Sequence, residues 1–218
     1  MPVYNERRTI SEILRQVREV NIDKEIIIVD DCSTDGTRDL LKHLDKDIKI
    51  IYHAHNKGKG EAIKTGLREA RGDLVLIQDA DLEYNPQEYY KLIQPILEGK
   101  TDIVYGSRFL EGNKFTLSCP YWANRFLTFV TNLLYGSKLT DMETCYKVFK
   151  RDILESMDIE AVSFDFEPEV TAKVLKKEYK ILEVPISYRG RGYHEGKKIS
   201  WKDGLAALYC LLKFRVRD

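Results

Sequence analysis

The sequence predicts an α/β domain with a Rossmann-like, mostly parallel sheet flanked by helices. Short runs that are apolar at every residue alternate with amphipathic stretches of ten or more residues. Strands that are apolar on both faces are typical of parallel sheets covered by helices on both sides. Acidic and glycine-rich motifs follow these strands, at the edge where open parallel sheets bind their ligands.

The first half of the chain shows this alternation most clearly. The run 26–29 is β-branched at every position, and Ser33 or Thr34 can open the helix after it. Gly72 closes a later helix, and Pro86 stands in the first turn of another. The expected elements are a strand over 25–30, a helix over 34–44, a strand over 48–53, a helix over 60–71, a strand over 74–77, a helix over 86–97 and a strand over 102–105.

Beyond residue 110 the alternation of strands and helices is less regular, and at the start of the chain the expected first strand is not apparent. Residues 1–6 have loop chemistry although a doubly wound sheet should open with a strand, so we expect that strand to be missing or its position to be filled by another segment. The later elements expected are a helix around 122–135, a strand near 145–149, a helix over 167–177, a strand over 179–187, a polar loop to residue 198 and a final helix from residue 201.

Composition and charge narrow the function classes. The 218 residues predict one domain, and 35 basic residues balance 35 acidic ones, so the whole chain gives no reason to expect a nucleic-acid partner. Residues 188–218 hold eight basic against three acidic residues, which suggests a phosphate-rich partner or a membrane surface, and the alternative is a solvated basic helix. The four scattered cysteines suggest reduced thiols in the cytosol and no zinc site. The longest apolar run, 205–212, is too short to span a membrane.

The most informative motif is Gln78-Asp79-Ala80-Asp81, which directly follows the expected strand over 74–77. Two carboxylates held close together repel each other, and a divalent cation relieves the repulsion. Hard oxygen ligands favour Mg²⁺ or Mn²⁺, and Mg²⁺ commonly shares its shell with substrate phosphates. The alternative is that the two carboxylates only cap a turn.

Two further motifs follow strands. Asp30 ends the strand over 25–30, where its carboxylate suits a base or a ribose hydroxyl, whereas Asp35 is better placed to cap the next helix. The segment 55–62 leads into a helix with glycines and lysines that could bind a phosphate, although taken alone the pattern favours a surface turn. It matches neither the dinucleotide-binding fingerprint nor the P-loop, which argues against a kinase, a GTPase or an NAD enzyme.

Taken in chain order, these motifs resemble those of the family-2 inverting glycosyltransferases of GT-A fold. Within that family the chain most resembles the dolichyl-phosphate mannose synthase and polyprenyl-phosphate glycosyltransferase branch, although it carries Glu83 where mannose synthases usually have Gln. The motifs that carry the resemblance are PVYNE (2–6), VDDCSTDGT (29–37), NKGKG (56–60), DAD (79–81), GSR (106–108), DMETCYK (141–147) and RGRGYHEGKK (189–198).

The resemblance implies a UDP- or GDP-hexose donor, a Mg²⁺ or Mn²⁺ ion and a polyprenyl phosphate acceptor. It also implies roles for particular residues, with Asp141, Arg108 and Asp81 closest to the chemistry. On the donor side, the base and ribose would contact Pro2, Tyr4, Glu6 and Asp30, the nucleotide side of the cleft would hold Lys57 and Lys59, and the metal and the donor diphosphate would be bound by Asp79 and Asp81. On the acceptor side, Arg108 would face the sugar or the acceptor phosphate, Asp141 would be a base or an acceptor-orienting carboxylate, and Glu169 would face the acceptor. Phosphates would be bound by Arg189, Arg191, Lys197 and Lys198.

We therefore expect one GT-A domain over 1–218, with a nucleotide-sugar half (1–110), an acceptor half (111–198) and a C-terminal helix (199–218) that lies on a membrane surface or packs on the sheet. The expected activity is transfer of a hexose to a polyprenyl phosphate at the cytoplasmic face of a membrane, by a peripheral protein that binds no nucleic acid. Two alternatives are a family-2 transferase that acts on a cell-envelope polysaccharide or lipopolysaccharide, and a nucleotide-sugar-binding module without turnover.

Overall fold

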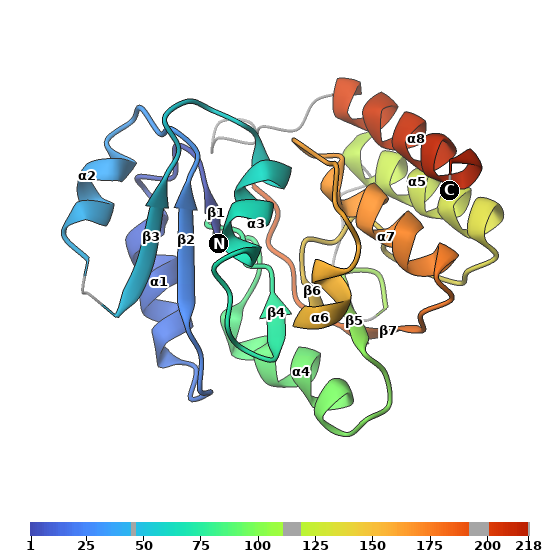
Figure 1. Ribbon diagram of the computed structural model, residues 1–218, viewed down its shortest axis with the longest axis horizontal. Coiled ribbons are helices and arrows are strands. Elements are labelled where there is room, and N and C mark those ends of the chain that lie inside the picture. Colours follow the sequence, from blue (N-terminus) through green and yellow to red (C-terminus); the bar gives the residue numbers. More distant parts are fainter. Residues whose placement is uncertain (45–46, 111–118, 192–200, 218) are drawn as a thin grey trace.

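The computed structural model describes residues 1–44, 47–110, 119–191 and 201–217, whose strands form two sheets (Figure 1). The first sheet is parallel, in the order β1-β2-β3, and the second is mixed, in the order β4-β6-β5-β7. The strands are β1 (Pro2–Val3), β2 (Ile26–Asp30), β3 (Ile48–Tyr52), β4 (Leu74–Leu76), β5 (Ile103–Ser107), β6 (Lys147–Lys150) and β7 (Ile181–Pro185).

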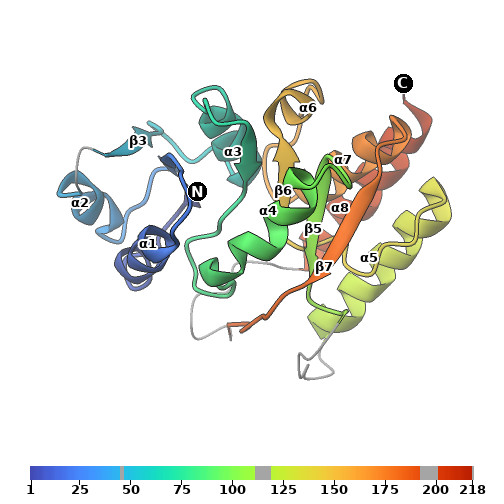
Figure 2. The same cartoon turned by 90° about the horizontal axis from the view of Figure 1, so that it is seen from below.

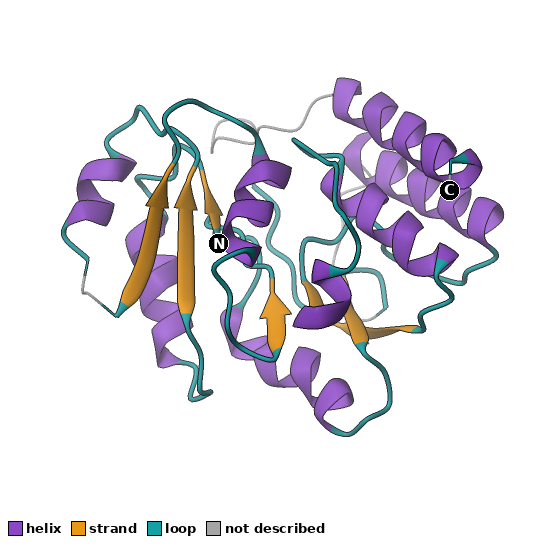
Figure 3. Ribbon diagram, in the orientation of Figure 1, coloured by secondary structure: helices purple, strands orange, loops and turns teal. Residues whose placement is uncertain are grey.

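Helices lie on both sides of these strands (Figure 3). They are α1 (Ile10–Glu19), α2 (Thr37–Lys42), α3 (Lys59–Leu67), the 3₁₀ turn η1 (Pro86–Glu88), α4 (Tyr89–Leu97), α5 (Cys119–Tyr135), α6 (Arg151–Glu155), α7 (Phe166–Lys176) and α8 (Trp201–Val216).

The first strand of the sheet is present, which corrects the expectation that residues 1–6 are only a loop. Pro2 and Val3 pair in parallel with Val29 and Asp30 of β2. The strand is only two residues long, too short for an apolar run to signal it. Because β1 ends at Val3, the residues after it lie at the same edge as the carboxyl end of β2.

The expected elements agree with the structure apart from their bounds and two omitted helices; α3, for example, ends at Leu67 and not at Gly72. α1 was not expected, although Ile10, Ile13, Leu14 and Val17 recur at helical spacing and are buried. The short α6 was also not expected. α2 begins at Thr37 instead of residue 34 because the Asp35 side chain accepts a hydrogen bond from the Thr37 backbone N–H at 3.0 Å.

β6 runs antiparallel to both of its neighbours, β4 and β5, within an otherwise parallel arrangement. The carboxyl ends of β4 and β5 therefore meet the amino end of β6 at one edge of the second sheet. This edge brings the segment after β4, the segment after β5 and the segment before β6 together.

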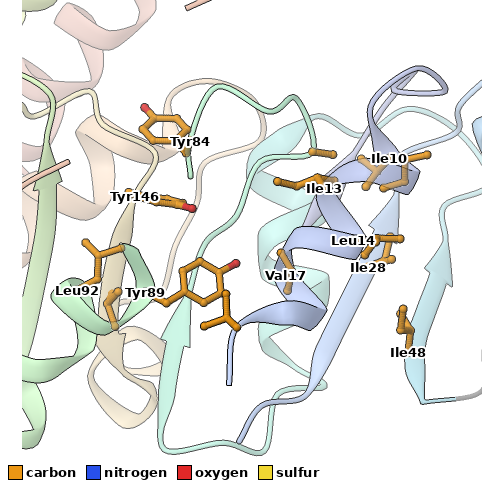
Figure 4. Close-up of a cluster of buried hydrophobic side chains, with 14 of the residues drawn as sticks. Ile10, Ile13, Leu14, Val17, Ile28, Ile48, Tyr84, Tyr89, Leu92 and Tyr146 are labelled. Atoms are coloured by element: carbon orange, nitrogen blue, oxygen red, sulfur yellow. The ribbon is translucent and has the colours of Figure 1, made fainter. Parts of the chain in front are cut away.

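The largest buried cluster joins the two sheets on the side of α1 and α4. In Figure 4 the α1 residues Ile10, Ile13, Leu14 and Val17 face the sheet, and Tyr84, Tyr89 and Tyr146 line the part nearer α4. A second cluster packs α3, α6 and α7 on the opposite side of the second sheet. The two clusters hold the strand ends in place from both faces.

A third cluster lies among α5, α7 and α8, which group together at the end of the molecule away from α2 and β3 (Figures 1 and 2). The inward residues of α8, Ala207, Cys210, Leu211 and Phe214, are buried there. In the part of the chain that the structure describes, no helix combines the length and the apolar character that crossing a membrane requires.

Candidate active site

Asp79 lies just beyond β4 and forms an ion pair with the amino-terminal end of α3. Lys59 Nζ lies 3.0 Å from Asp79 Oδ2, 2.9 Å from Glu167 Oε1 and 3.1 Å from Cys145 Sγ. Burial, the largest influence, acts to raise the pKa of Asp79, but the Lys59 ammonium, a hydrogen bond from Cys145 and the N-terminal ammonium together lower it. Burial alone would lower the pKa of Lys59, whereas these neighbours hold it well above its ordinary value. Asp79 is therefore a charged carboxylate with a fixed counter-ion.

Asp81, two residues on, is in the opposite electrostatic situation. Burial, followed by repulsion from Asp79 and Glu83, raises its pKa to about 7. Its Oδ1 accepts a hydrogen bond from the Glu83 backbone N–H at 3.1 Å, and its Oδ2 accepts one from Arg191 at 3.1 Å. The environment of Asp81 is short of positive charge even with that guanidinium in place.

This donor set fits a divalent cation of the Mg²⁺ or Mn²⁺ type. The ligands would be carboxylate oxygens of Asp79 and Asp81, and added positive charge would lower the raised pKa of Asp81. Within residues 1–44, 47–110, 119–191 and 201–217, no group of three or more acidic, histidine or cysteine side chains is arranged to hold a metal alone. The remaining ligands would have to be water and donor phosphates, as is common for Mg²⁺.

Arg191 lies among three carboxylates, which we call the acid cluster: Glu6, Asp81 and Glu83. Its terminal nitrogens donate to the two Glu6 oxygens at 3.0 and 3.2 Å, and one of them also donates to Asp81. Glu6 follows β1, so this contact joins the amino-terminal sheet to the segment after β7. Arg189 is exposed, and its backbone N–H donates to the Glu83 carbonyl at 2.9 Å.

Arg108 and Asp141 form a buried two-point ion pair at the carboxyl end of β5. Arg108 donates from Nε and from a terminal nitrogen to the two Asp141 oxygens, each at 2.7 Å, and its backbone N–H adds a third bond at 2.9 Å. The Asp141 side chain is 0% exposed. Burial opposes the charge on Arg108, but Asp141 keeps the Arg108 pKa well above its ordinary value. Asp141 is thus a carboxylate fully engaged by one guanidinium.

Tyr188 and Glu83 connect the two arginines. The Arg108 guanidinium stacks over the Tyr188 ring at 5.1 Å, and the Tyr188 hydroxyl donates to Glu83 Oε2 at 2.8 Å. The Arg108–Asp141 pair and the acid cluster therefore belong to one connected site across the edge where β4, β5 and β6 meet.

On the nucleotide side, Asp30 is held at one oxygen only. Its Oδ2 accepts from Arg38 Nε and from the Ser33 backbone N–H at 3.3 Å. Its Oδ1 is buried and has no hydrogen-bond partner among the described residues. Such an acceptor is costly to leave unpaired, and it suits a ligand N–H or O–H.

Asp31, to which the sequence analysis gave no role, organises the glycine-rich loop. Its carboxylate accepts from the backbone N–H groups of Lys57 and Gly58 at 2.8 and 2.7 Å and lies 2.7 Å from His53 Nδ1. Gly58 has φ +88. A Cβ there would lie 2.3 Å from the Val162 carbonyl oxygen, so glycine is required for the loop to approach.

Buried charges behind the site were also not predicted from the sequence. Lys147, on β6, has a fully buried side chain that donates to the carbonyls of Met142 and Thr144 and lies 4.4 Å from the Tyr105 ring centroid. Glu143 lies between Met142 and Thr144, the two residues whose carbonyls accept from Lys147. Burial and then the charge of Glu167 raise the Glu143 pKa to about 7. No sequence signal marks such groups, because the segments that surround them are far apart in the chain.

The remaining expected residues have different placements. Pro2 is part of β1, and Tyr4 follows it at the edge of the sheet. Glu169 lies on α7, where its carboxylate accepts from the backbone N–H groups of residues 160 and 161 at 2.7 and 2.5 Å and forms an ion pair with Lys173. Lys197 and Lys198 lie outside the described residues.

Comparison with known proteins identifies relatives among glycosyltransferases. The family described as "Glycosyl transferase family 2" matches residues 1–158. A low-salt glycan biosynthesis hexosyltransferase of Haloferax volcanii, Agl6, is 31% identical over 88% of this chain and 47% of its own. A dolichol-phosphate mannosyltransferase of Pyrococcus furiosus is 29% identical over 98% of this chain and 63% of its own. The chain thus spans between about half and two thirds of the length of these two relatives.

One relative matches over nearly its whole length. The UDP-N-acetylglucosamine–dolichyl-phosphate N-acetylglucosaminyltransferase of Methanococcus voltae is 30% identical over 99% of this chain and 94% of its own. Among solved structures, glucosyl-3-phosphoglycerate synthase of Mycobacterium tuberculosis bound to UDP matches with a TM-score of 0.77 and 20% identity, over 98% of this chain and 78% of its own. That likeness confirms the expected GT-A fold.

Proposed function

The chain belongs to glycosyl transferase family 2, and from that premise we propose that it is an inverting, metal-dependent hexosyltransferase that uses a nucleotide diphosphate-sugar donor and a polyprenyl phosphate acceptor. One observation carries the proposal. A pair of carboxylates suited to a divalent cation lies at the edge where β4, β5 and β6 meet, with Arg191 on Asp81 and with Arg108 linked to the same cluster through Tyr188 and Glu83.

The donor half of the site is assigned to the edge formed by β1, β2 and β4. Asp30 offers its buried Oδ1 to a hydroxyl or ring N–H of the nucleoside. Asp79 and Asp81 would hold a Mg²⁺ or Mn²⁺ ion, which when bound supplies positive charge to the leaving diphosphate. Arg191 adds a guanidinium beside the same carboxylates, well suited to a phosphate that enters there.

The acceptor half is assigned to the ends of β5 and α5. A lipid phosphate is already ionised at neutral pH, so its attack on the sugar needs little proton removal. The Asp141 carboxylate is engaged by three donors of Arg108, so we assign it to orienting that arginine instead of acting as a base. Arg108 would then stabilise the phosphate of the acceptor.

The acceptor assignment follows the names of the relatives. The Pyrococcus relative is a dolichol-phosphate mannosyltransferase and the Methanococcus relative transfers N-acetylglucosamine to dolichyl phosphate. The Pro2–Val3 strand fills the first position of the sheet, which removes the reason to consider a binding module without turnover.

An exposed apolar surface on α5 and α8 supports a location at a membrane. Its residues recur at helical spacing on the two helices, and α5 carries an arginine but no acidic residue. Arg125 on α5 donates to the Thr140 carbonyl at 3.2 Å, next to Asp141, so this surface borders the acceptor half. The surface consists of Trp122, Phe126, Phe129 and Leu133 on α5, and Trp201, Leu205, Tyr209, Leu212 and Val216 on α8.

We propose that this α5/α8 surface lies on the cytoplasmic face of a membrane that contains the acceptor lipid. Apolar side chains beside basic ones favour the interface of an anionic leaflet. In this position a lipid phosphate would reach Arg108 without leaving the headgroup layer.

The test is titration of UDP-glucose, UDP-N-acetylglucosamine and GDP-mannose into the protein, each with Mn²⁺ and with EDTA, on the wild type and on Asp81→Ala. We expect one donor to bind with Mn²⁺ only, and Asp81→Ala to lose that binding. Radiolabelled sugar should then be transferred to a polyprenyl phosphate in vesicles. Donor binding without transfer to any polyprenyl phosphate would contradict the acceptor assignment.

A further inference from the structure

The segment 188–191, which we call the strap, is fastened across the acid motif by Glu83. The Glu83 side chain accepts from the Tyr188 hydroxyl at 2.8 Å and from the Arg191 backbone N–H at 2.7 Å. The Glu83 backbone carbonyl accepts from the Arg189 backbone N–H at 2.9 Å. The next residue, Tyr84, forms an isolated antiparallel β-bridge with Tyr188. One residue therefore fixes both the backbone and an aromatic side chain of the strap.

The strap delivers the Arg191 guanidinium into the acid cluster. The guanidinium binds both oxygens of Glu6 and lies 3.1 Å from Asp81 Oδ2, with its Nε 3.9 Å from Glu83. Its side chain is 15% exposed, so water screens these contacts only partly. The other Asp81 oxygen accepts the Glu83 N–H, so both oxygens of this carboxylate are occupied.

We propose that Arg191 is the resident counter-ion of the acid cluster, and that Glu83 latches the strap so that this guanidinium competes with a divalent cation for Asp81. The proposal rests on the proposed function, because the cation in question is the one that accompanies the donor. Glu83 is on this view a positioning residue that acts through Arg191.

Competition for one carboxylate has a consequence for the order of binding. A cation that arrives alone must displace the guanidinium from Asp81, which leaves Arg191 with Glu6 as its partner, and two cations close to one carboxylate repel each other. A nucleoside diphosphate supplies phosphate oxygens to which the displaced guanidinium can turn. Cation and nucleotide therefore promote each other's binding, and the cation alone binds weakly.

The first experiment measures binding of Mn²⁺ alone to the nucleotide-free protein by calorimetry, and free Mn²⁺ by electron paramagnetic resonance. Arg191→Met removes the competing charge, and Arg68→Met is the matched control because that arginine has an exposed side chain (68%) at the end of α3 and no role in the site. We expect Arg191→Met to bind Mn²⁺ alone at least about fivefold more tightly than the wild type, the lower end of coupling between interacting sites. Arg68→Met should match the wild type.

Unchanged or weaker Mn²⁺ binding by Arg191→Met would overturn the proposal. The proposed function is tested separately, because its failure would appear as an absence of sugar transfer. The Mn²⁺ affinities of the wild type and Arg191→Met would still test whether Arg191 competes with the cation. Circular dichroism checks that each variant folds.

A second measurement tests the latch without metal and does not depend on Arg191→Met being folded. Hydrogen exchange of the strap amides is compared in the wild type, Glu83→Gln and Glu83→Ala. Gln keeps an acceptor for the Arg191 N–H, so exchange should stay close to that of the wild type, whereas Ala removes it and exchange should accelerate. Equal exchange in Ala and the wild type would refute the latch.

Discussion

The buried pair of Arg108 and Asp141 yields the sharpest prediction. Asp141→Asn keeps the volume of the side chain, removes its charge and replaces one acceptor oxygen with an amide that donates. The guanidinium of Arg108 donates to both oxygens at 2.7 Å, so the new amide faces a donor instead of receiving one. The substitution therefore leaves a buried cation without its counter-ion.

The expected cost follows from the burial of both partners. Their side chains are 8% and 0% exposed, and removing one partner of such a pair costs about 3–5 kcal/mol. For a protein of this size each kcal/mol lowers the melting temperature by roughly 2–4 °C, so we expect a fall of roughly 6–20 °C. Arg108→Met combined with Asp141→Asn removes the orphaned charge, and its cost should be smaller than the sum of the two single costs.

Urea unfolding followed by circular dichroism measures these free energies for the wild type, both single variants and the double variant. A loss below about 1 kcal/mol for Asp141→Asn, the size of an ordinary surface change, would refute the reasoning from burial. The rate of sugar transfer by Asp141→Asn then distinguishes a phosphate acceptor from a hydroxyl acceptor. Below its melting temperature, Asp141→Asn should keep part of its activity with a phosphate acceptor, whereas a hydroxyl acceptor that needs a base would give none.

Three other predictions test the interior, the glycine loop and the α5/α8 surface. The folded-state pKa of Glu143, about 7, is above its ordinary value of 4.5, so this carboxyl lowers the free energy of unfolding as pH rises from about 4.5 to about 7. In urea unfolding, Glu143→Gln should equal the wild type near pH 4 and be more stable than the wild type by about 3 kcal/mol near pH 8. A Cβ at Gly60 would lie 2.6 Å from a backbone carbonyl oxygen, so Gly60→Ala should cost about 1–3 kcal/mol, whereas Gly66→Ala, with its nearest atom at 3.5 Å, should be neutral or stabilising in the same assay. Leu133→Ser should lower the affinity for anionic vesicles, measured by co-sedimentation, about tenfold. Leu97→Ser, which changes an equally exposed leucine (72% each) on α4, should leave that affinity unchanged. Equal loss in both variants would contradict the membrane assignment.

The sequence predicts those parts of the fold that depend on local pattern. The β-branched run of β2 and the Pro86 that opens the turn before α4 are signals within a few residues, and the structure confirms both, whereas α3 ends at Leu67 and not at the expected Gly72. The direction of β6 is not local, because it depends on how α5 returns the chain between β4 and β5. β1 escaped detection because two residues are too few for a pattern.

The same distinction applies to the site. Asp79 and Asp81 are adjacent to a strand end, so their position follows from the pattern that predicts β4. The contact of Arg191 with Glu6 joins residues 185 positions apart, and no spacing rule reports it. The resemblance did identify Arg191 as a residue of the site, but the role of Glu83 in holding its backbone depends on side-chain geometry.

The position of β6 also constrains how the protein can form during translation. β4 ends at Leu76, and its only partner among the described strands begins at Lys147. At about 5–20 residues per second, a ribosome needs roughly 4–14 seconds to synthesise the interval, and through this time the apolar strand has no neighbour to pair with. The nascent chain should therefore offer Leu74–Leu76 to chaperones until β6 emerges, and the carboxylates after β4 and the guanidinium after β5 then come together in a single late step of folding.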